Sequence, residues 1–110
     1  MSRAIAGFDW DAGNRLKCEK HGVTVAEIEF CFSQPITVLP DEAHSGNEER
    51  LRAIARSRSG RYVFIVFTVR TRNTKRTIRP ISARYMHAKE IAHYEKENSE
   101  QIVEQVIRPT

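Results

Sequence analysis

Hydrophobic and polar positions recur with two different periods along the 110-residue chain, and the changes of period divide it into helices and strands. The first helical segment is Ala12 to His21, which Asp11 precedes as an N-cap and Gly22 ends. The second follows a capping box at Thr24-Val25-Ala26-Glu27 and ends before Pro35. The first third of the chain is therefore predicted to form two short helices joined at Gly22.

The middle of the chain has the spacing and composition of strands. We expect strands at Ile36–Leu39, Leu51–Arg56, Arg61–Val69 and Arg76–Ala83. The third is rich in β-branched and aromatic residues, as a central strand should be. Short turns separate the last three strands, which favours an antiparallel meander. Pro80 predicts a bulge or an edge position in the last strand.

The helical period returns from Met86 to Glu97, and the tail from 98 to 110 also has apolar residues at helical spacing. The tail either continues this helix or packs as a separate piece. Residues 1–97 are thus predicted to form one α+β domain with two N-terminal helices, a four-stranded antiparallel sheet and one or two C-terminal helices. We expect the helices to gather on one face of the sheet and leave the other face partly open.

The basic residues are distributed unevenly, although the net charge is only +4. Eleven of them lie between positions 50 and 84 with no Asp or Glu among them, while nine acidic residues precede this block and five follow it. They are Arg50, Arg52, Arg56, Arg58, Arg61, Arg70, Arg72, Lys75, Arg76, Arg79 and Arg84. Either acids from elsewhere fold over this block, or it forms a positive surface that binds a polyanion.

Other features narrow the class of protein. The longest apolar run, Tyr62 to Phe67, is too short to span a membrane, and the N-terminus does not resemble a secretory signal, so we expect a cytoplasmic protein. Cys18 and Cys31 have no zinc-binding spacing and are interpreted as core thiols. No metal or cofactor is predicted.

Several stretches, in order from residue 8 to about 95, resemble the BrnT family of toxins. The stretches are Phe8-Asp9-Trp10-Asp11, Lys20-His21-Gly22-Val23, Glu49-Arg50 with Ala53-Ile54-Ala55-Arg56, Gly60 to Thr68, Ile78-Arg79-Pro80-Ile81-Ser82-Ala83-Arg84, and Lys89-Glu90 with His93-Tyr94-Glu95. The resemblance implies a RelE-like α+β fold and metal-independent RNA cleavage that inhibits translation. It also implies a BrnA-type antitoxin, which binds the toxin in a hetero-oligomer.

Metal-free RNA cleavage needs cations that stabilise the charged phosphorane. Arginine is suited to this role because its guanidinium group can form two parallel hydrogen bonds with two oxygens of one phosphate. Arg79 and Arg84 bracket the last predicted strand and are the candidates for catalysis. The alternative for each is a surface position or an ion pair with Glu49 or Glu90. Lys20, Arg50, Arg52, Arg56 and Arg76 are expected to contact RNA, or else to be solvated.

The same reaction needs groups that carry protons. His21 is a candidate because histidine titrates near neutral pH, although it could simply cap a helix. Glu49 and Glu90 could act as bases or only orient an arginine, and Tyr94 could contact RNA or be a half-buried helix aromatic. If no proton carrier lies beside the arginines, the alternative is a non-enzymatic protein that only binds an antitoxin-like partner or nucleic acid.

Overall fold

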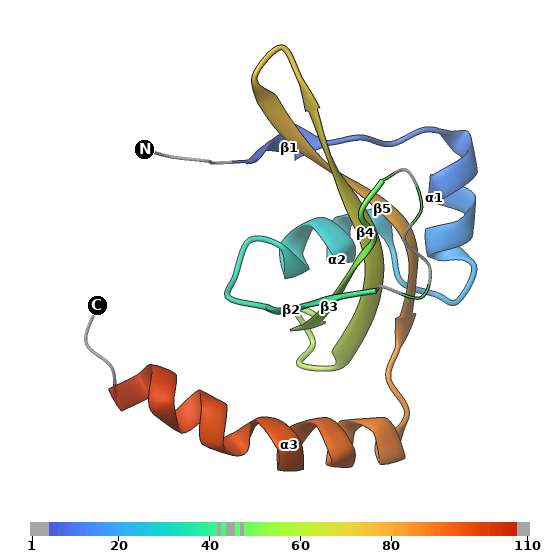
Figure 1. The fold of residues 1–110 in the computed structure, drawn as a ribbon. Helices are drawn as coiled ribbons and strands as arrows, with labels where there is room; N and C mark the ends of the chain where they lie inside the picture. The colour runs from blue at the N-terminus through green and yellow to red at the C-terminus, as the bar shows by residue number, and fades with distance from the viewer. Residues whose placement is uncertain (1–4, 42, 44–45, 47, 108–110) are drawn as a thin grey trace.

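In the computed structural model, the described residues are 5–41, 43, 46 and 48–107. Within them, five strands form one sheet in the order β1-β5-β4-β3-β2 (Figure 1). The strands are β1 (Ile5–Phe8), β2 (Thr37–Pro40), β3 (Leu51–Arg56), β4 (Tyr62–Arg72) and β5 (Lys75–Tyr85). The predicted antiparallel strands correspond to β2 to β5, which pair as a meander.

The prediction of a four-stranded, purely antiparallel sheet is wrong in one respect. The missed strand, β1, pairs in parallel with β5 and closes that side of the sheet. Four residues are too few to display a two-residue period, and the pairing partner of β1 lies about seventy residues further along the chain. Nothing local in the sequence therefore indicated this strand.

The two N-terminal helices begin as the sequence predicts. Helix α1 (Ala12–Glu19) starts at Asp11, whose carboxylate accepts a hydrogen bond from the Asn14 amide at 3.0 Å. Helix α2 (Val25–Cys31) starts at the Thr24 capping box, in which the Thr24 hydroxyl accepts a hydrogen bond from the Glu27 amide. Gly22 between them has φ +92°, a left-handed conformation that glycine adopts at little cost.

The hydrophobic core lies between these helices and one face of the sheet, which we call the core face. Val63, Ile65 and Phe67 of β4 are buried there with Ile28 of α2. Cys18 and Cys31 are buried in the same core as free thiols, as predicted, and burial raises the pKa of each to about 11. Both thiols are therefore protonated and unreactive at neutral pH.

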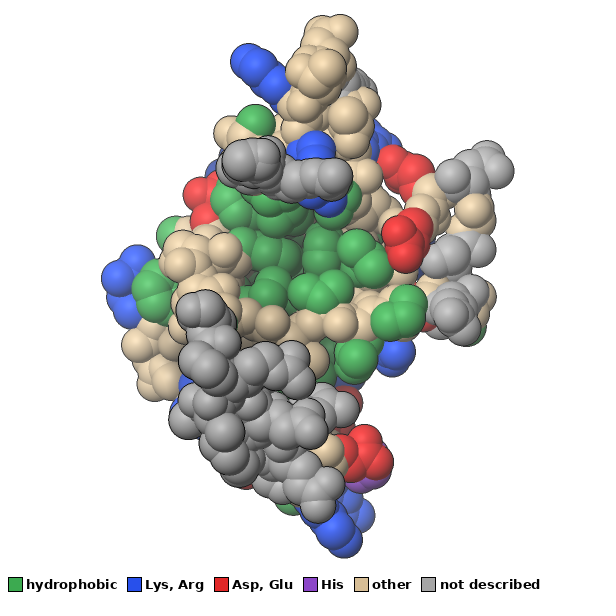
Figure 2. Space-filling model, turned by 60° about the vertical axis from the view of Figure 1, so that its left-hand side comes forward, with side chains coloured by type: hydrophobic (Ala, Val, Ile, Leu, Met, Phe, Trp, Pro, Cys, Tyr) green, Lys and Arg blue, Asp and Glu red, His purple; other side chains and the backbone are tan. Residues whose placement is uncertain are grey.

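The two short helices leave part of the hydrophobic surface exposed. Val38 of β2 is 46% exposed and Ile5 of β1 is 40% exposed. Phe8, Phe32 and Leu51 are only partly buried at the margin of the core. Figure 2 shows hydrophobic side chains gathered in one continuous area on this side of the molecule. This area is larger than scattered surface residues would produce.

Helix α3 (Ala88–Ile107) is a single helix that includes residues 98–107 of the predicted tail. It contacts the face of the sheet opposite the core face, which we call the open face. The Tyr94 and Thr37 hydroxyl groups are hydrogen-bonded to each other, and Glu95 accepts a hydrogen bond from Tyr62. Figure 1 shows α3 running along one end of the sheet, apart from α1 and α2. The expectation that all helices gather on one face is therefore wrong.

Strand β5 contains the bulge that Pro80 predicted. Val66 pairs with Ser82 and Phe67 pairs with Pro80, so Ile81 has no partner in β4. Asn14 of α1 donates to the Pro80 carbonyl at 2.8 Å and to the Asp9 carbonyl at 3.0 Å. These bonds fasten α1 to the sheet at the bulge.

Candidate functional site

The open face presents its side chains in rows across the strands. Directly opposed residues point to the same side of a sheet, so the strand register defines each row. The first row is Leu39, Arg52, Val66 and Ser82; the second is Thr37, Ile54, Phe64 and Arg84; the third is Arg56 and Tyr62. Neighbouring rows are two residues apart, about 7 Å along the strands. Each row therefore carries one arginine beside apolar or aromatic groups.

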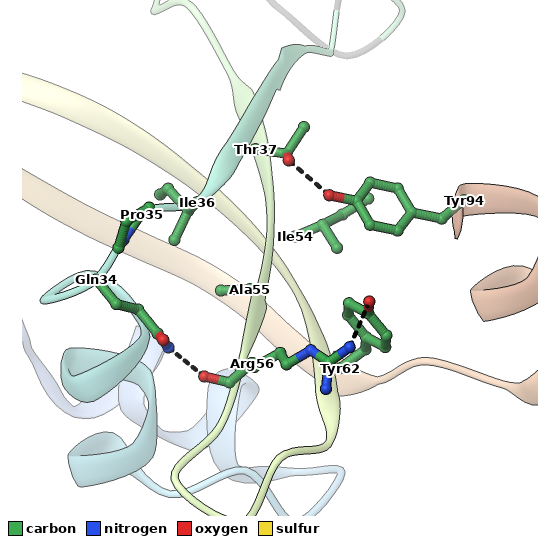
Figure 3. A pocket seen from close by; sticks show the side chains of 9 residues that line it. All are labelled: Gln34, Pro35, Ile36, Thr37, Ile54, Ala55, Arg56, Tyr62 and Tyr94. Atoms are coloured by element: carbon green, nitrogen blue, oxygen red, sulfur yellow. Dashed lines mark hydrogen bonds between the residues drawn. The ribbon is translucent and has the colours of Figure 1, made fainter. Parts of the chain in front are cut away.

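The third row meets α3 in a cluster of arginine and tyrosine side chains (Figure 3). The Arg56 guanidinium lies 4.4 Å from the Tyr62 ring centroid and donates a 2.8 Å hydrogen bond to the Tyr62 hydroxyl. That hydroxyl donates to Glu95 of α3 at 3.0 Å. The rings of Tyr62 and Tyr94 meet edge to face at 5.7 Å. The cluster thus joins a cation, two phenols and a carboxylate.

A cavity of about 430 Å³ opens beside this cluster. Its lining residues come from the α2–β2 connection, from strands β2, β3 and β4, and from α3. They are Gln34, Pro35, Ile36, Thr37, Ile54, Ala55, Arg56, Tyr62 and Tyr94. Figure 3 shows Tyr94 reaching from α3 toward Thr37, to which its hydroxyl is hydrogen-bonded at 2.6 Å. The cavity therefore brings together two of the sequence-predicted residues, Arg56 and Tyr94.

Arg84 is held in place by Glu90 at the start of α3. Its two terminal nitrogens donate to the two carboxylate oxygens, each at 2.8 Å. The hydrogen bond from Arg84, followed by one from the His87 backbone amide, lowers the pKa of Glu90 to about 2. Glu90 is thus ionised at neutral pH and is a very weak base. Of the two roles foreseen for Glu90, the contacts favour orienting the arginine.

Arg79 lies toward the other end of β5 and has different partners. It pairs with Asp11 at 2.8 Å and with Asp9 at 3.6 Å, where β1 leads into α1. The backbone hydrogen bond from Asn14 and the one from Arg79 lower the pKa of Asp11. The β4 partners of Arg79 and Arg84 are four residues apart, about 13 Å along the strand. The two predicted catalytic arginines therefore share no ion-pair partner.

The remaining predicted residues are dispersed. Lys20 and His21 are exposed in the turn between α1 and α2, and Glu49 is exposed just before β3. Arg76 lies in β5 opposite Ile5 of β1. None of these four residues lines a cavity of the open face.

Arg50 and Arg52 line a second cavity on the open face. Arg52 donates to the Pro40 carbonyl at 3.0 Å. Together with Arg56, they are the predicted RNA-binding residues that the fold places on the open face or at its margin.

Sequence reasoning missed three residues of this region. Tyr62 and Phe64 were given no role beyond the predicted strand Arg61–Val69, and Glu95 was given none beyond the predicted helix from Met86 to Glu97. The two-residue period of β4 could have assigned Tyr62 and Phe64 to one face, together with Val66. The contact between Glu95 and Tyr62 joins residues 33 positions apart and has no local signal.

Two other kinds of site are absent from the part of the chain that the structure describes. No group of three or more His, Cys, Asp or Glu side chains there could hold a metal ion. No helix there combines the length and the apolar composition needed to cross a membrane.

A comparison with known protein families shows to which family the chain belongs. The family model described as the ribonuclease toxin BrnT of type II toxin–antitoxin systems matches residues 10–90. The chain belongs to the BrnT family. The matched range runs from just before α1 to the first turn of α3, so it includes β2 to β5 of the open face. A search of curated proteins found no match.

Membership of the BrnT family assigns this protein to the ribonuclease toxins, whose partner is an antitoxin. Tyr94 and Glu95 lie just beyond the matched range, whereas Arg56, Tyr62, Arg84 and Glu90 lie within it. The arginine–aromatic rows are therefore part of the segment that the family shares.

Proposed function

We propose that this BrnT protein is a metal-independent endoribonuclease that cleaves RNA on its open face by attack of the 2′-hydroxyl. The observation that carries the proposal is the convergence of Arg56, Arg84 and Tyr94 at one end of this face, where α3 crosses it. Arginine and tyrosine together supply the cation and the stacking surface that single-stranded RNA requires. Cleavage of messenger RNA would inhibit translation in the cytoplasm.

In this reaction the 2′-oxygen attacks phosphorus and the bond to the 5′-oxygen breaks, which leaves a 2′,3′-cyclic phosphate and a 5′-hydroxyl. Arg84 and Arg56 neutralise the charge that develops on the phosphorane oxygens. Glu95 and Tyr94 bring proton-carrying groups to the same cluster, one to accept the 2′ proton and one to donate to the departing oxygen. Glu90 orients Arg84.

The proposal gives no catalytic role to His21, Glu49 or Arg79. His21 and Glu49 are exposed away from the cavities of the open face. Arg79 pairs with Asp9 and Asp11 about 13 Å along the strand from Arg84, away from the cluster that Arg56 and Tyr94 form. Arg79 instead stabilises the junction between β1 and α1. Lys20 and Arg76 retain at most peripheral contacts with the RNA backbone.

We further propose that a BrnA-type antitoxin inhibits the toxin by covering the open face. The arginines there would attract an acidic segment of the antitoxin, which would then compete with RNA. Reversing the charge with Arg84→Glu should weaken antitoxin binding and reduce its salt dependence. Unchanged affinity and salt dependence would place the antitoxin elsewhere on the molecule.

The ribonuclease proposal is tested by incubating the antitoxin-free protein with single-stranded RNA in EDTA. The Arg84→Ala variant is compared with Arg58→Ala, which removes an exposed arginine that stacks on Phe30 of α2. Circular dichroism checks that both variants fold. The parent and Arg58→Ala should yield 2′,3′-cyclic phosphate ends, and Arg84→Ala should not.

The other outcomes each have a definite meaning. Equal cleavage by all three proteins would keep the ribonuclease activity but remove Arg84 from the site. If none of the three cleaves RNA, repeating the assay with ribosomes separates a ribosome-dependent enzyme from the alternative function, a protein that only binds its antitoxin or nucleic acid.

A further inference from the structure

The second cavity of the open face lies against the first two rows, next to the proposed cleavage site. It has a volume of about 310 Å³ and is lined by Asp41, Arg50, Arg52, Phe64, Val66 and Ser82. Its size is near the lower end for small-molecule sites, which suits a single nucleotide better than a folded partner. The nucleotide adjoining the scissile bond is thus an occupant of suitable size.

Arg52 is the first indication that this cavity receives a ligand. Its side chain donates one hydrogen bond to the Pro40 carbonyl, but its Nε atom is buried and has no hydrogen-bond partner. A buried donor without a partner is unfavourable, and a charged one more so. Because Arg52 lines the cavity, a ligand seated there brings a phosphate oxygen or a base carbonyl next to this under-bonded guanidinium.

Phe64 is the second indication and connects the cavity to the proposed reaction site. Its ring is only partly buried although it lies in the middle of the sheet, and the Arg84 guanidinium is 4.8 Å from its centroid. A base that enters the cavity would contact the Phe64 ring while its phosphate faces Arg84. Base–aromatic contact of this kind is a common way to hold single-stranded nucleic acid.

The cavity also carries groups that form hydrogen bonds with a base. The Ser82 hydroxyl can donate and accept, and the Asp41 carboxylate can only accept. A carboxylate accepts from the amino group of adenine, guanine or cytosine and from the ring N–H of guanine or uracil. Neighbouring rows of the open face are about 7 Å apart. This distance is similar to the distance between successive phosphates along an extended single strand of RNA.

From these contacts we infer that the cavity lined by Arg52, Phe64 and Ser82 is a base-binding subsite for single-stranded RNA. The subsite seats one base beside the phosphate held by Arg84. The inference rests on the proposed ribonuclease function, because it takes the nucleotide next to the scissile bond as the occupant. It adds a specificity-determining site to that function.

The test measures the binding of a fluorescently labelled 2′-O-methyl RNA hexamer of mixed sequence by anisotropy. This probe lacks the 2′-hydroxyl nucleophile, so binding is read without cleavage. Phe64→Leu removes the aromatic surface, and Ser82→Leu fills part of the cavity while the Phe64 ring is retained. The matched control is Phe30→Leu, which removes an aromatic ring that stacks on Arg58 and is outside the cavity.

Phe64→Leu and Ser82→Leu should each weaken binding about 10-fold, while Phe30→Leu should bind like the parent. A sugar–phosphate hexamer without bases should bind the parent and Phe64→Leu equally, since the lost contact is with a base. Unchanged binding of the 2′-O-methyl hexamer by both cavity variants would overturn the subsite. Equal weakening by Phe30→Leu would also overturn it.

Cleavage of unmodified RNA, measured with the same proteins, separates the two proposals. If the parent cleaves RNA but the cavity variants bind normally, the subsite fails and the ribonuclease function stands. If the parent binds but cleaves RNA neither alone nor with ribosomes, and the cavity variants bind weakly, the subsite stands and the ribonuclease function fails. If the parent does not bind the hexamer, the subsite fails, and the ribonuclease function fails with it only if the parent also cleaves no RNA, alone or with ribosomes.

Discussion

The two faces of the sheet use alternate residues of the same strands and have opposite characters. In β4, Val63, Ile65 and Phe67 are buried on the core face. Tyr62 and Phe64, one position away, point to the open face and lie beside Arg56 and Arg84. A shift of one residue would exchange these two sets. The register of a single strand therefore separates the residues that stabilise the fold from those proposed to bind RNA.

The helices are divided between the two faces of the sheet in the same way. Helices α1 and α2 pack on the core face through buried side chains such as Cys18 and Ile28. Helix α3 meets the open face through polar and aromatic contacts, among them Arg84–Glu90 and Tyr94–Thr37. Contacts of this kind stabilise less than core packing does, but they place charged and hydroxyl groups where a substrate could reach them. Mutations on the two faces should consequently affect different properties.

The largest effect on stability is expected at Ile65, which is fully buried in the centre of β4. Ile65→Ala should lower the free energy of unfolding by about 2–5 kcal/mol, because it leaves a cavity in a packed core. Urea denaturation measures the change. Val66→Ala, the matched variant on the open face, should cost less than about 1 kcal/mol. Equal losses would show that the open face is also part of the core.

Asn14 should affect stability but not catalysis. Asn14→Ala removes two hydrogen bonds to the Asp9 and Pro80 carbonyls and leaves them without this donor. The expected cost is about 1–3 kcal/mol of unfolding free energy. RNA cleavage at a temperature where the variant is fully folded should equal that of the parent. A selective loss of cleavage in the folded variant would extend the functional region to α1.

A smaller effect, on activity alone, is expected for Arg84→Lys. Lysine keeps the positive charge but cannot form the paired hydrogen bonds that a guanidinium makes with phosphate. Cleavage should fall about 10-fold, with a change in unfolding free energy below about 1 kcal/mol. Full activity in Arg84→Lys would mean that charge alone is sufficient at this position.

The smallest effect concerns Glu90 and pH. The Arg84 guanidinium lowers the pKa of Glu90 from 4.5 to about 2, so the stabilisation is complete above pH 4.5 and is lost as the pH falls toward 2. The carboxylate is more than one-third exposed, and solvent screening limits the contribution to about 1 kcal/mol. Between pH 4.5 and 2, the parent should lose about this much more stability than Glu90→Gln. If the free energy of unfolding of both proteins falls by the same amount over this pH range, the Arg84–Glu90 ion pair does not stabilise the fold.

The sequence predicted those parts of the fold that depend on neighbouring residues. The Asp11 and Thr24 caps, the four meander strands and the bulge at Pro80 all have local signals, and all are present. Strand β1 and the side of the sheet on which α3 lies depend on contacts between distant residues, and the sequence pattern did not reveal them.

The candidate site shows the same limit. Arg84, Arg56 and Tyr94 could be chosen by residue type and by resemblance to the BrnT family, and the fold places them at one end of the open face. His21 and Glu49 were chosen by the same reasoning, but they lie outside this region because no local pattern specifies which face of the fold a loop residue reaches. Tyr62 and Glu95 became candidates only through their contact in three dimensions.

The most direct test of the central claim is to find which face binds RNA by following aromatic side-chain signals in NMR spectra. A 2′-O-methyl RNA hexamer is titrated into the protein while the signals of Tyr62, Phe64 and Tyr94 are compared with the indole N–H of Trp10. Trp10 bonds to Glu29 of α2 and serves as the reporter for the helices of the core face. The open-face signals should shift and the Trp10 signal should not. Shifts confined to Trp10 would contradict the account.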